Sequence, residues 1–492
     1  MLKRLVIVIF IMFGAFLSFS LYRTFAYDTS VVEEVPSTTD LEYTFKIGNS
    51  SIKQITVDSG ETKYYDIVLG NPNNAKISYS VYYEMVSPST KPDDYKIEYT
   101  SKSTGNSTGI VNNNGNITLN IVVTNTSSNA VTVKVGTVAG YVKGGELTLN
   151  SGQEVIPKKV FPKATYVVEH LDDGTTGDSG SGVYKITHSA IPAESSATGS
   201  EIPAVTDYRY YGPRPNNYIC LDMEGSSTCP GKHLYKIIGS IYEELEGTNR
   251  IKVIKASLIT DGKTNGFSWD YKSDGTYDNI WATPTNGNYS NSLTSGSQLM
   301  KLLNSGAWWN GTSGSYYNES TTATIVNFTN YKLSDKAKSY ISISRYYLGG
   351  YNTSRGVMTN QFYVYERGTA RYDVNRPLYW DGMVGLIYLS DYGYAAGNNC
   401  VTGIDPYNYY SKGCMNKDWL YYSSTYQWLM SPDSNFSDLV FGVYGAGYVS
   451  YGSVIGGGGD YLCSVRPSFY LTSDVVITSG TGTFSDPYQI TK

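Results

Sequence analysis

The sequence predicts a multidomain protein with an N-terminal transmembrane helix, an all-β sandwich and a larger α+β domain. Three observations predict this fold class. The chain begins with an uncharged apolar segment, continues through strands of period two, and ends in a long region where short helices interrupt strands. Tyr and Gly, at 48 and 50 of 492 residues, favour strands and the turns between them.

The apolar segment follows two basic residues and is long enough to cross a membrane. Roughly 18 uncharged residues from Leu5 to Tyr22 span about 27 Å as a helix, close to the ~30 Å hydrocarbon core. Basic residues before such a segment favour a cytoplasmic N-terminus and an external remainder. We therefore expect residues 1–27 to be a single-pass anchor that holds the bulk of the chain at the cell surface. The alternative is a signal peptide cleaved near Ala26, which gives a secreted protein.

Residues 42–165 alternate apolar and polar side chains in the manner of half-buried strands. The alternation is clear in 77–85 and 131–135, and turn-forming residues such as those at 70–74 separate the runs. Short strands of this kind favour an all-β sandwich. The stretch 60–79, in which Gly-Glu-Thr precedes Tyr-Tyr-Asp-Ile-Val-Leu-Gly-Asn, resembles the immunoglobulin-like stalk modules of bacterial surface proteins. This resemblance implies a spacer.

The next segment, 166–206, is predicted to be an exposed junction. It is rich in Gly, Ser, Thr and Pro around one short strand candidate at 183–186. The remainder, 207–492, is predicted to be one domain, in which the apolar runs at 234–241 and 251–258 indicate strands.

Two helices are predicted within this last domain. The first spans 296–304, with Ser295 as its N-cap and Gln298 completing a capping box. The second spans 335–348, with Ser334 as its N-cap and two glycines after it as a stop. Helices embedded among strands give the α+β class.

The cysteines suit an exported protein, because disulfides persist in oxidising compartments. Of the five, Cys220 and Cys229 flank one short polar loop, and Cys400 and Cys414 flank another. Each pair is a disulfide candidate worth about 2–3 kcal/mol. Cys463 belongs to neither of these pairs. The alternative to the two disulfides is that all five cysteines are free thiols. Neither pair has C-x-x-C spacing, so the cysteines indicate neither a zinc site nor thioredoxin-like chemistry.

A set of motifs spread over roughly the last 280 residues resembles one protein family. The motifs lie at 207–212, 215–220, 234–239, 298–304, 360–368, 390–395, 418–421, 427–432, 465–467, 471–475 and 485–488. The family consists of surface proteins of low-GC, Firmicutes-type bacteria and has no established activity to carry over. The Trp-Leu-x-Ser-Pro element, the Gly-rich stretch after it and the final Val-Arg-Pro also resemble C-type-lectin-like domains and the formylglycine-generating-enzyme family. That resemblance implies a fold for 207–492, not a function.

The stretch 436–462 is the main candidate for a binding surface. It is rich in Tyr, Ser and Gly, which combine large contact area with adaptable loops, as in antibody paratopes. The ligand-facing candidates are Tyr444, Tyr448, Tyr451, Ser453, Asp460 and Tyr461, with Trp309 as a residue that stacks on a sugar ring. Residues 407–410 and 421–422 are expected to border them. The alternative is a structural hairpin with tyrosines in its core, and Trp428 and Arg466 are predicted to be structural.

The sequence offers little for catalysis or metal binding. Motifs of serine hydrolases, zinc proteases and P-loops are absent, and the spacing of His170, His188 and His233 indicates no metal site. The acidic loop 270–278 fails the alternating pattern of calcium loops, so calcium is the less favoured interpretation there. A glycoside hydrolase remains an alternative if two carboxylates converge. The carboxylates in question are Asp270, Glu366, Asp381 and Asp391.

These observations together predict a membrane-anchored recognition or adhesion protein, not an enzyme. Its partners are expected to be the membrane and an extracellular glycan, peptide or host-surface ligand, bound noncovalently and without a cofactor. A net charge of -5 disfavours nucleic acid. The first alternative is a structural surface-layer or pilus-like component, and the second is a surface hydrolase.

Overall fold

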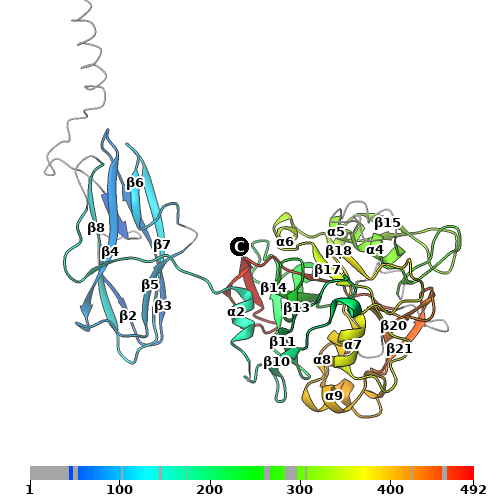
Figure 1. The fold of residues 1–492 in the computed structure, drawn as a ribbon. Helices are drawn as coiled ribbons and strands as arrows, with labels where there is room; N and C mark the ends of the chain where they lie inside the picture. Colours follow the sequence, from blue (N-terminus) through cyan, green and yellow to red (C-terminus); the bar gives the residue numbers. More distant parts are fainter. Residues whose placement is uncertain are drawn as a thin grey trace, which may run out of the picture. The chain divides into compact units, whose positions relative to one another are not determined.

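The computed structural model divides the chain into two compact units between Val160 and Phe161 (Figure 1). The residues that the structure describes are 44–47, 54–100, 103–142, 147–172, 174–259, 266–282, 296–304, 307–422, 425–456 and 463–492. Strand residues predominate over helical residues and form several sheets, which confirms the β-rich prediction. The predicted anchor from Leu5 to Tyr22 and the cleavage site at Ala26 lie outside the described residues. Within the described ranges, no helix is both long and apolar enough to span a membrane.

The first unit contains two antiparallel sheets that share one apolar core. One sheet has the order β1(Thr44–Ile47), β3(Thr62–Gly70), β7(Asn116–Asn125), β5(Tyr95–Tyr99). The other has the order β2(Gln54–Val57), β8(Val131–Tyr141), β4(Ile77–Ser87), β6(Thr108–Val111), with β9(Gln153–Val155) paired to β4. Alternate side chains of both sheets, such as Leu69, Val81 and Leu119, meet in this core. The period-two pattern thus corresponds to one buried and one solvated face per sheet.

The second unit is built on a sheet of eight strands. Its main path is β10(Gly182–His188), β11(Val205–Tyr211), β13(Leu234–Glu243), β12(Tyr218–Cys220), β24(Tyr488–Thr491), β23(Val476–Ser479). Two further strands, β14(Thr248–Lys255) and β22(Ser468–Tyr470), extend it from β13. The pairing of β12 with β24 is parallel and brings the end of the chain beside an early strand.

The prediction that residues 166–206 form an exposed junction was wrong, because these residues belong to the second unit. Its helix α2(Ala164–Glu169) buries Ala164 and Val168, and β10 pairs with β11 along its full length, from Gly182 opposite Tyr211 to His188 opposite Val205. The Gly- and Ser-rich residues that suggested a linker are the turns on either side of this edge strand.

Smaller sheets and short helices complete the second unit. The small sheets are β19(Gln427–Pro432)–β20(Leu439–Val443)–β21(Val449–Ser453), β17(Ser344–Tyr347)–β18(Tyr379–Gly382) and β15(Ser313–Tyr316)–β16(Thr324–Asn327). The helices are α4(Gln298–Asn304), α5(Ala307–Asn310), α6(Asp335–Ser339), α7(Thr359–Glu366), α8(Leu389–Ala395), α9(Asn398–Gly403), η1(Ala193–Ser195), η2(Gly231–His233), η3(Thr329–Tyr331), η4(Pro406–Asn408) and η5(Cys414–Lys417). Helices and strands share one large core in this unit, beside a smaller cluster of Tyr363, Tyr394 and Val401.

The two predicted helices form, with different limits. In α4 the hydroxyl of Ser297 accepts a hydrogen bond from the backbone N–H of Met300, while Ser295 lies outside the described residues. Ser334 caps α6 as expected, but that helix ends at Ser339. Farther along the predicted helix, Ser344–Tyr347 form β17 instead, because this segment with two tyrosines pairs with β18.

Both cysteine pairs proposed from the sequence are disulfide-bonded in the structure. Cys220 and Cys229 close one loop, Cys400 and Cys414 close another, and Cys463 is a buried thiol. The second disulfide ties the start of η5 back to α9 and so delimits the loop that carries η4.

Candidate functional site

The hairpin of β20 and β21 holds two tyrosines at its turn. The backbone N–H of Tyr444 donates to the carbonyl of Tyr448, at 2.9 Å, so the two residues face each other across the turn. Their rings stack with centroids 4.8 Å apart and planes 15° apart. Gly447 adopts φ +86°, a left-handed conformation that glycine takes without strain. This turn therefore presents a preformed aromatic pair.

Two further tyrosines and an arginine extend this pair. Tyr426 meets Tyr444 edge-on at 4.8 Å, and Tyr407 meets Tyr448 in the same manner at 5.9 Å. The guanidinium of Arg355 lies 4.4 Å from the ring centroid of Tyr407 and donates to its hydroxyl at 2.6 Å. Arg355 is exposed and the four tyrosines are half-buried. We call these five side chains the tyrosine surface.

Backbone contacts fix the segments that carry this surface. The carboxylate of Asp405 accepts hydrogen bonds from the N–H of Asn408 in η4 and from the N–H of Gly356, beside Arg355. The hydroxyl of Ser354 donates to the carbonyl of Val449 at the start of β21, at 2.8 Å. One carboxylate and one hydroxyl thus tie three separate segments together.

Two hydroxyls of this surface, those of Tyr444 and Tyr448, stay protonated at physiological pH. Burial raises the pKa of Tyr444 to about 12 and also raises the pKa of Tyr448. The Tyr444 hydroxyl donates to the carbonyl of Tyr451 at 3.0 Å. The surface therefore offers hydroxyl groups and ring faces beside one guanidinium group.

The structure brings together some of the predicted ligand-facing residues. Tyr444 and Tyr448 lie at the centre, Tyr451 is 44% exposed on the adjoining strand, and Ser453 lies farther along that strand. Asp460, Tyr461 and the side chain of Trp309 lie outside what the structure describes.

Sequence reasoning missed Arg355 and Tyr426, while Tyr407 falls in the stretch expected to border the site. No local spacing connects these residues, because they reach the hairpin from separate loops. The residues predicted to be structural, Trp428 and Arg466, are buried, and the Trp428 indole donates to the carbonyl of Phe267 at 2.6 Å.

A cavity of about 630 Å³ lies along β10, α7, the end of α8 and α9. His188 lines it, with its ring stacked on Tyr363 at a centroid distance of 3.5 Å and with Nε2 3.0 Å from Oδ2 of Asp207. Burial lowers the pKa of His188 despite that carboxylate, which favours the neutral imidazole. The cavity wall is thus aromatic and polar, and it includes the exposed side chain of Lys185.

Behind this wall lies a chain of buried ion pairs. Arg209 joins Asp207 at 2.8 Å to Asp391 at 2.7 Å, and Lys252 reaches Asp391 at 2.6 Å. Burial alone opposes ionisation of Asp391, but Lys252 and Arg209 outweigh it and its pKa falls to about 2. These charges compensate one another and hold β11, β14 and α8 together.

The carboxylates considered for a hydrolase are engaged separately. Asp391 belongs to the ion pairs above, and Asp381 makes two hydrogen bonds with Arg345. Glu366 is fully buried and accepts hydrogen bonds from Ser390 and Ser431. Each is therefore held as a structural group, and this geometry adds nothing in favour of glycoside hydrolysis.

The acidic loop considered for calcium contains its own cation. Lys272 Nζ lies 3.2 Å from Asp270 Oδ2 and 2.7 Å from Asp278 Oδ2, so an ammonium group already pairs with both carboxylates. Elsewhere in the described ranges, donor atoms suited to a metal come together at Asp222, Glu224 and His233.

Comparison with family models and with curated proteins gives no match for this chain. The resemblance to surface proteins of low-GC bacteria and to C-type-lectin-like folds therefore stays a prediction. What the chain does has to be argued from its own side chains.

Proposed function

We propose that the chain is a noncatalytic cell-surface recognition or adhesion protein that binds an extracellular glycan, peptide or host-surface ligand through the tyrosine surface. One observation carries the proposal: four half-buried tyrosine rings and an arginine meet from loops far apart in the sequence. Tyrosine offers a broad ring face and a hydroxyl with few rotatable bonds, which suits reversible recognition. Arg355 adds a charge for anionic or polar groups.

The rigidity of this surface supports the same proposal. Because Asp405 and Ser354 fix the loops in place, little side-chain freedom is left to lose when a ligand binds. An aromatic cluster needed only for stability would be expected inside the core, as Trp428 is.

Export and anchoring are the second part of the proposal. Two disulfides suit an oxidising compartment, and the apolar segment 5–22 would be the anchor. The first unit, with two antiparallel sheets around one core, would be an immunoglobulin-like stalk. The second unit would be a C-type-lectin-like head that carries the tyrosine surface.

The proposal is tested by screening the purified protein against a glycan array and against host cells, with light scattering to detect self-association. Recognition predicts saturable binding to a defined set of glycans or to cells. Binding only to further copies of itself would instead support a structural surface component. Hydrolysis of an array glycan would support the enzyme alternative.

A further inference from the structure

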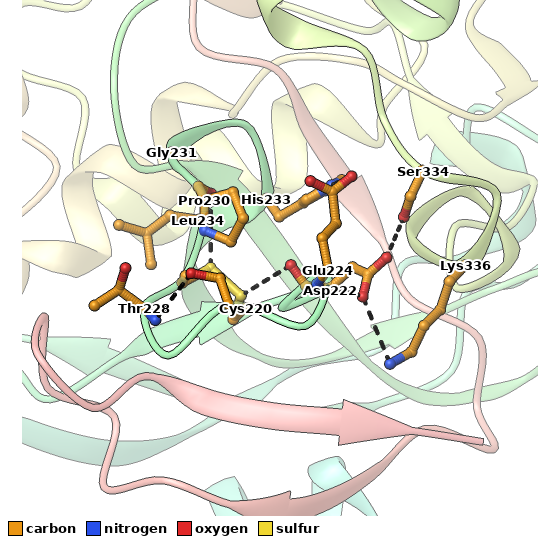
Figure 2. The surroundings of a disulfide bond; sticks show 12 residues. Cys220, Asp222, Glu224, Thr228, Pro230, Gly231, His233, Leu234, Ser334 and Lys336 are labelled. Carbon is orange, nitrogen blue, oxygen red and sulfur yellow. Dashed lines mark hydrogen bonds and ion pairs between the residues drawn. A yellow bond between two sulfur atoms is a disulfide. The ribbon is translucent and has the colours of Figure 1, made fainter.

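The loop closed by the first disulfide brings two carboxylates to a buried histidine (Figure 2). Asp222 and Glu224 lie inside the loop between Cys220 and Cys229, and His233 ends η2 just before β13. One donor atom from each of the three side chains lies within 4.8 Å of the other two. The disulfide loop therefore brings its two carboxylates to a histidine that lies nine or more positions farther along the chain.

His233 has no satisfactory partner in this arrangement. Its side chain is 0% exposed, and neither ring nitrogen makes a hydrogen bond. Nε2 approaches Oε1 of Glu224 to 3.2 Å, but this contact lacks hydrogen-bond geometry. A buried imidazole without a partner costs free energy, and native structures seldom leave one so. The observation points to a group that would bind this nitrogen.

Two lysines already compensate the charge of the carboxylates, but they do not block the access of another cation to the site. Lys232 Nζ lies 2.8 Å from Glu224, and Lys336 Nζ lies 3.7 Å from Asp222. Both lysine side chains are partly exposed, at 28% and 53%, so a cation can displace the ammonium groups into water.

The site is also oriented from a second element. The hydroxyl of Ser334 donates to Oδ2 of Asp222 at 2.6 Å, and the N–H of Glu224 donates to Oδ1 at 3.1 Å. Ser334 is at the same time the N-cap of α6. Such contacts fix a carboxylate ligand in the way that outer partners do in metal sites.

We propose that Asp222, Glu224 and His233 bind a divalent transition-metal ion, for which Zn²⁺ is the reference. An imidazole nitrogen with two carboxylate oxygens suits zinc and its neighbours, whereas calcium and magnesium prefer oxygen ligands alone. Three protein ligands leave a coordination position for water. The ion would fasten the disulfide loop to β13 and, through Ser334, to α6, on elements that the tyrosine surface does not use.

The test is titration of the chelator-treated protein with ZnCl₂ by calorimetry, without reductant so that the disulfides remain intact. The expected result is one zinc bound per chain, together with a zinc-dependent rise in Tm. Glu224→Gln and Asp222→Asn, which keep side-chain shape, should each weaken zinc binding at least about tenfold. Circular dichroism of the metal-free variants establishes that they fold.

Two control variants change residues of the same types, an aspartate and a histidine, at positions outside the proposed site. Asp335→Asn changes a fully exposed carboxylate on α6, and His170→Gln changes the exposed histidine at the C-cap of α2, so both should leave zinc binding intact. The proposal is overturned if the wild type binds no zinc, if the site variants bind it as tightly as the wild type, or if CaCl₂ binds there in preference to ZnCl₂.

Discussion

The rings of Tyr444 and Tyr448 stack 4.8 Å apart across the turn between β20 and β21. Each ring has a second tyrosine at its outer edge, Tyr426 on one side and Tyr407 on the other. Three loops must keep their positions for this arrangement to persist. Its dependence on the backbone beneath it can therefore be tested directly.

Gly447→Ala is expected to disturb the stack. Gly447 adopts φ +86°, and an added Cβ would lie 2.4 Å from Cβ of Met415. The left-handed conformation alone costs a residue with a side chain about 1–2 kcal/mol. The free energy of unfolding in urea should fall by at least that amount, with a changed near-ultraviolet tyrosine spectrum. Gly403→Ala, where nothing lies within 4 Å, is the control, and equal effects of the two changes would contradict this account.

Asp391→Asn is expected to destabilise the second unit strongly. Asp391 is buried between Arg209 and Lys252, and its loss leaves two cations without their shared partner. Breaking a buried ion pair in this way costs about 3–5 kcal/mol. Urea unfolding measures the change, and Asp335→Asn, on an exposed side chain, should leave the free energy of unfolding unaltered.

The same carboxylate predicts how stability depends on pH. Its pKa of about 2 in the folded protein lies below the ~3.9 of an unfolded aspartate. A lowered folded pKa stabilises the protein fully above the unfolded value, and this contribution is lost as the pH falls from about 4 toward 2. The Tm of the wild type should therefore fall more steeply over this range than the Tm of Asp391→Asn. Parallel curves would show that Asp391 does not carry this dependence.

Removing one disulfide or the other should have different consequences for ligand binding. Replacing Cys400 and Cys414 by Ser opens the loop that carries Tyr407, so it should cost about 3 kcal/mol in unfolding free energy and weaken ligand binding. Replacing Cys220 and Cys229 should also lower stability but leave binding at the tyrosine surface unchanged. Equal losses of binding in the two double variants would contradict the separation of the two regions.

The boundary between the two units predicts which fragments fold. A fragment that begins at Phe161 keeps α2 and β10, whereas one that begins at Asp207 loses the strand paired along β11. The first should show a cooperative thermal transition and the second should aggregate or melt at a lower temperature. A stable fragment from Asp207 would restore the view that 166–206 is a linker.

The sequence predicted the strand-rich first unit because one solvated face per sheet leaves a period-two pattern, as at 77–85. It indicated a strand at 183–186 but not its pairing with β11 in the main sheet, because the turn residues on both sides resemble a linker. The second helix was predicted too long for a related reason. Its cap at Ser334 is a local signal, whereas the pairing of Ser344–Tyr347 with β18 depends on residues far along the chain.

The same distinction between local sequence signals and long-range contacts applies to the tyrosine surface and to the proposed metal site. Tyr444 and Tyr448 were found because a Tyr/Gly/Ser-rich hairpin is visible in sequence, but Arg355 and Tyr426 approach only in the folded chain. The spacing of His233 from the other histidines did not indicate a metal site. Its companions are carboxylates, and the disulfide between Cys220 and Cys229 supplies their proximity.

The central claim is that the tyrosine surface binds an extracellular ligand. The most direct measurement compares glycan-array and host-cell binding of the wild type with that of Tyr444→Ala, Tyr448→Ala and the control Tyr64→Ala, an exposed tyrosine of the first unit. The account predicts about tenfold or greater loss for the first two variants, with folding retained, and no loss for the control. Wild-type binding by folded Tyr444→Ala and Tyr448→Ala would contradict it.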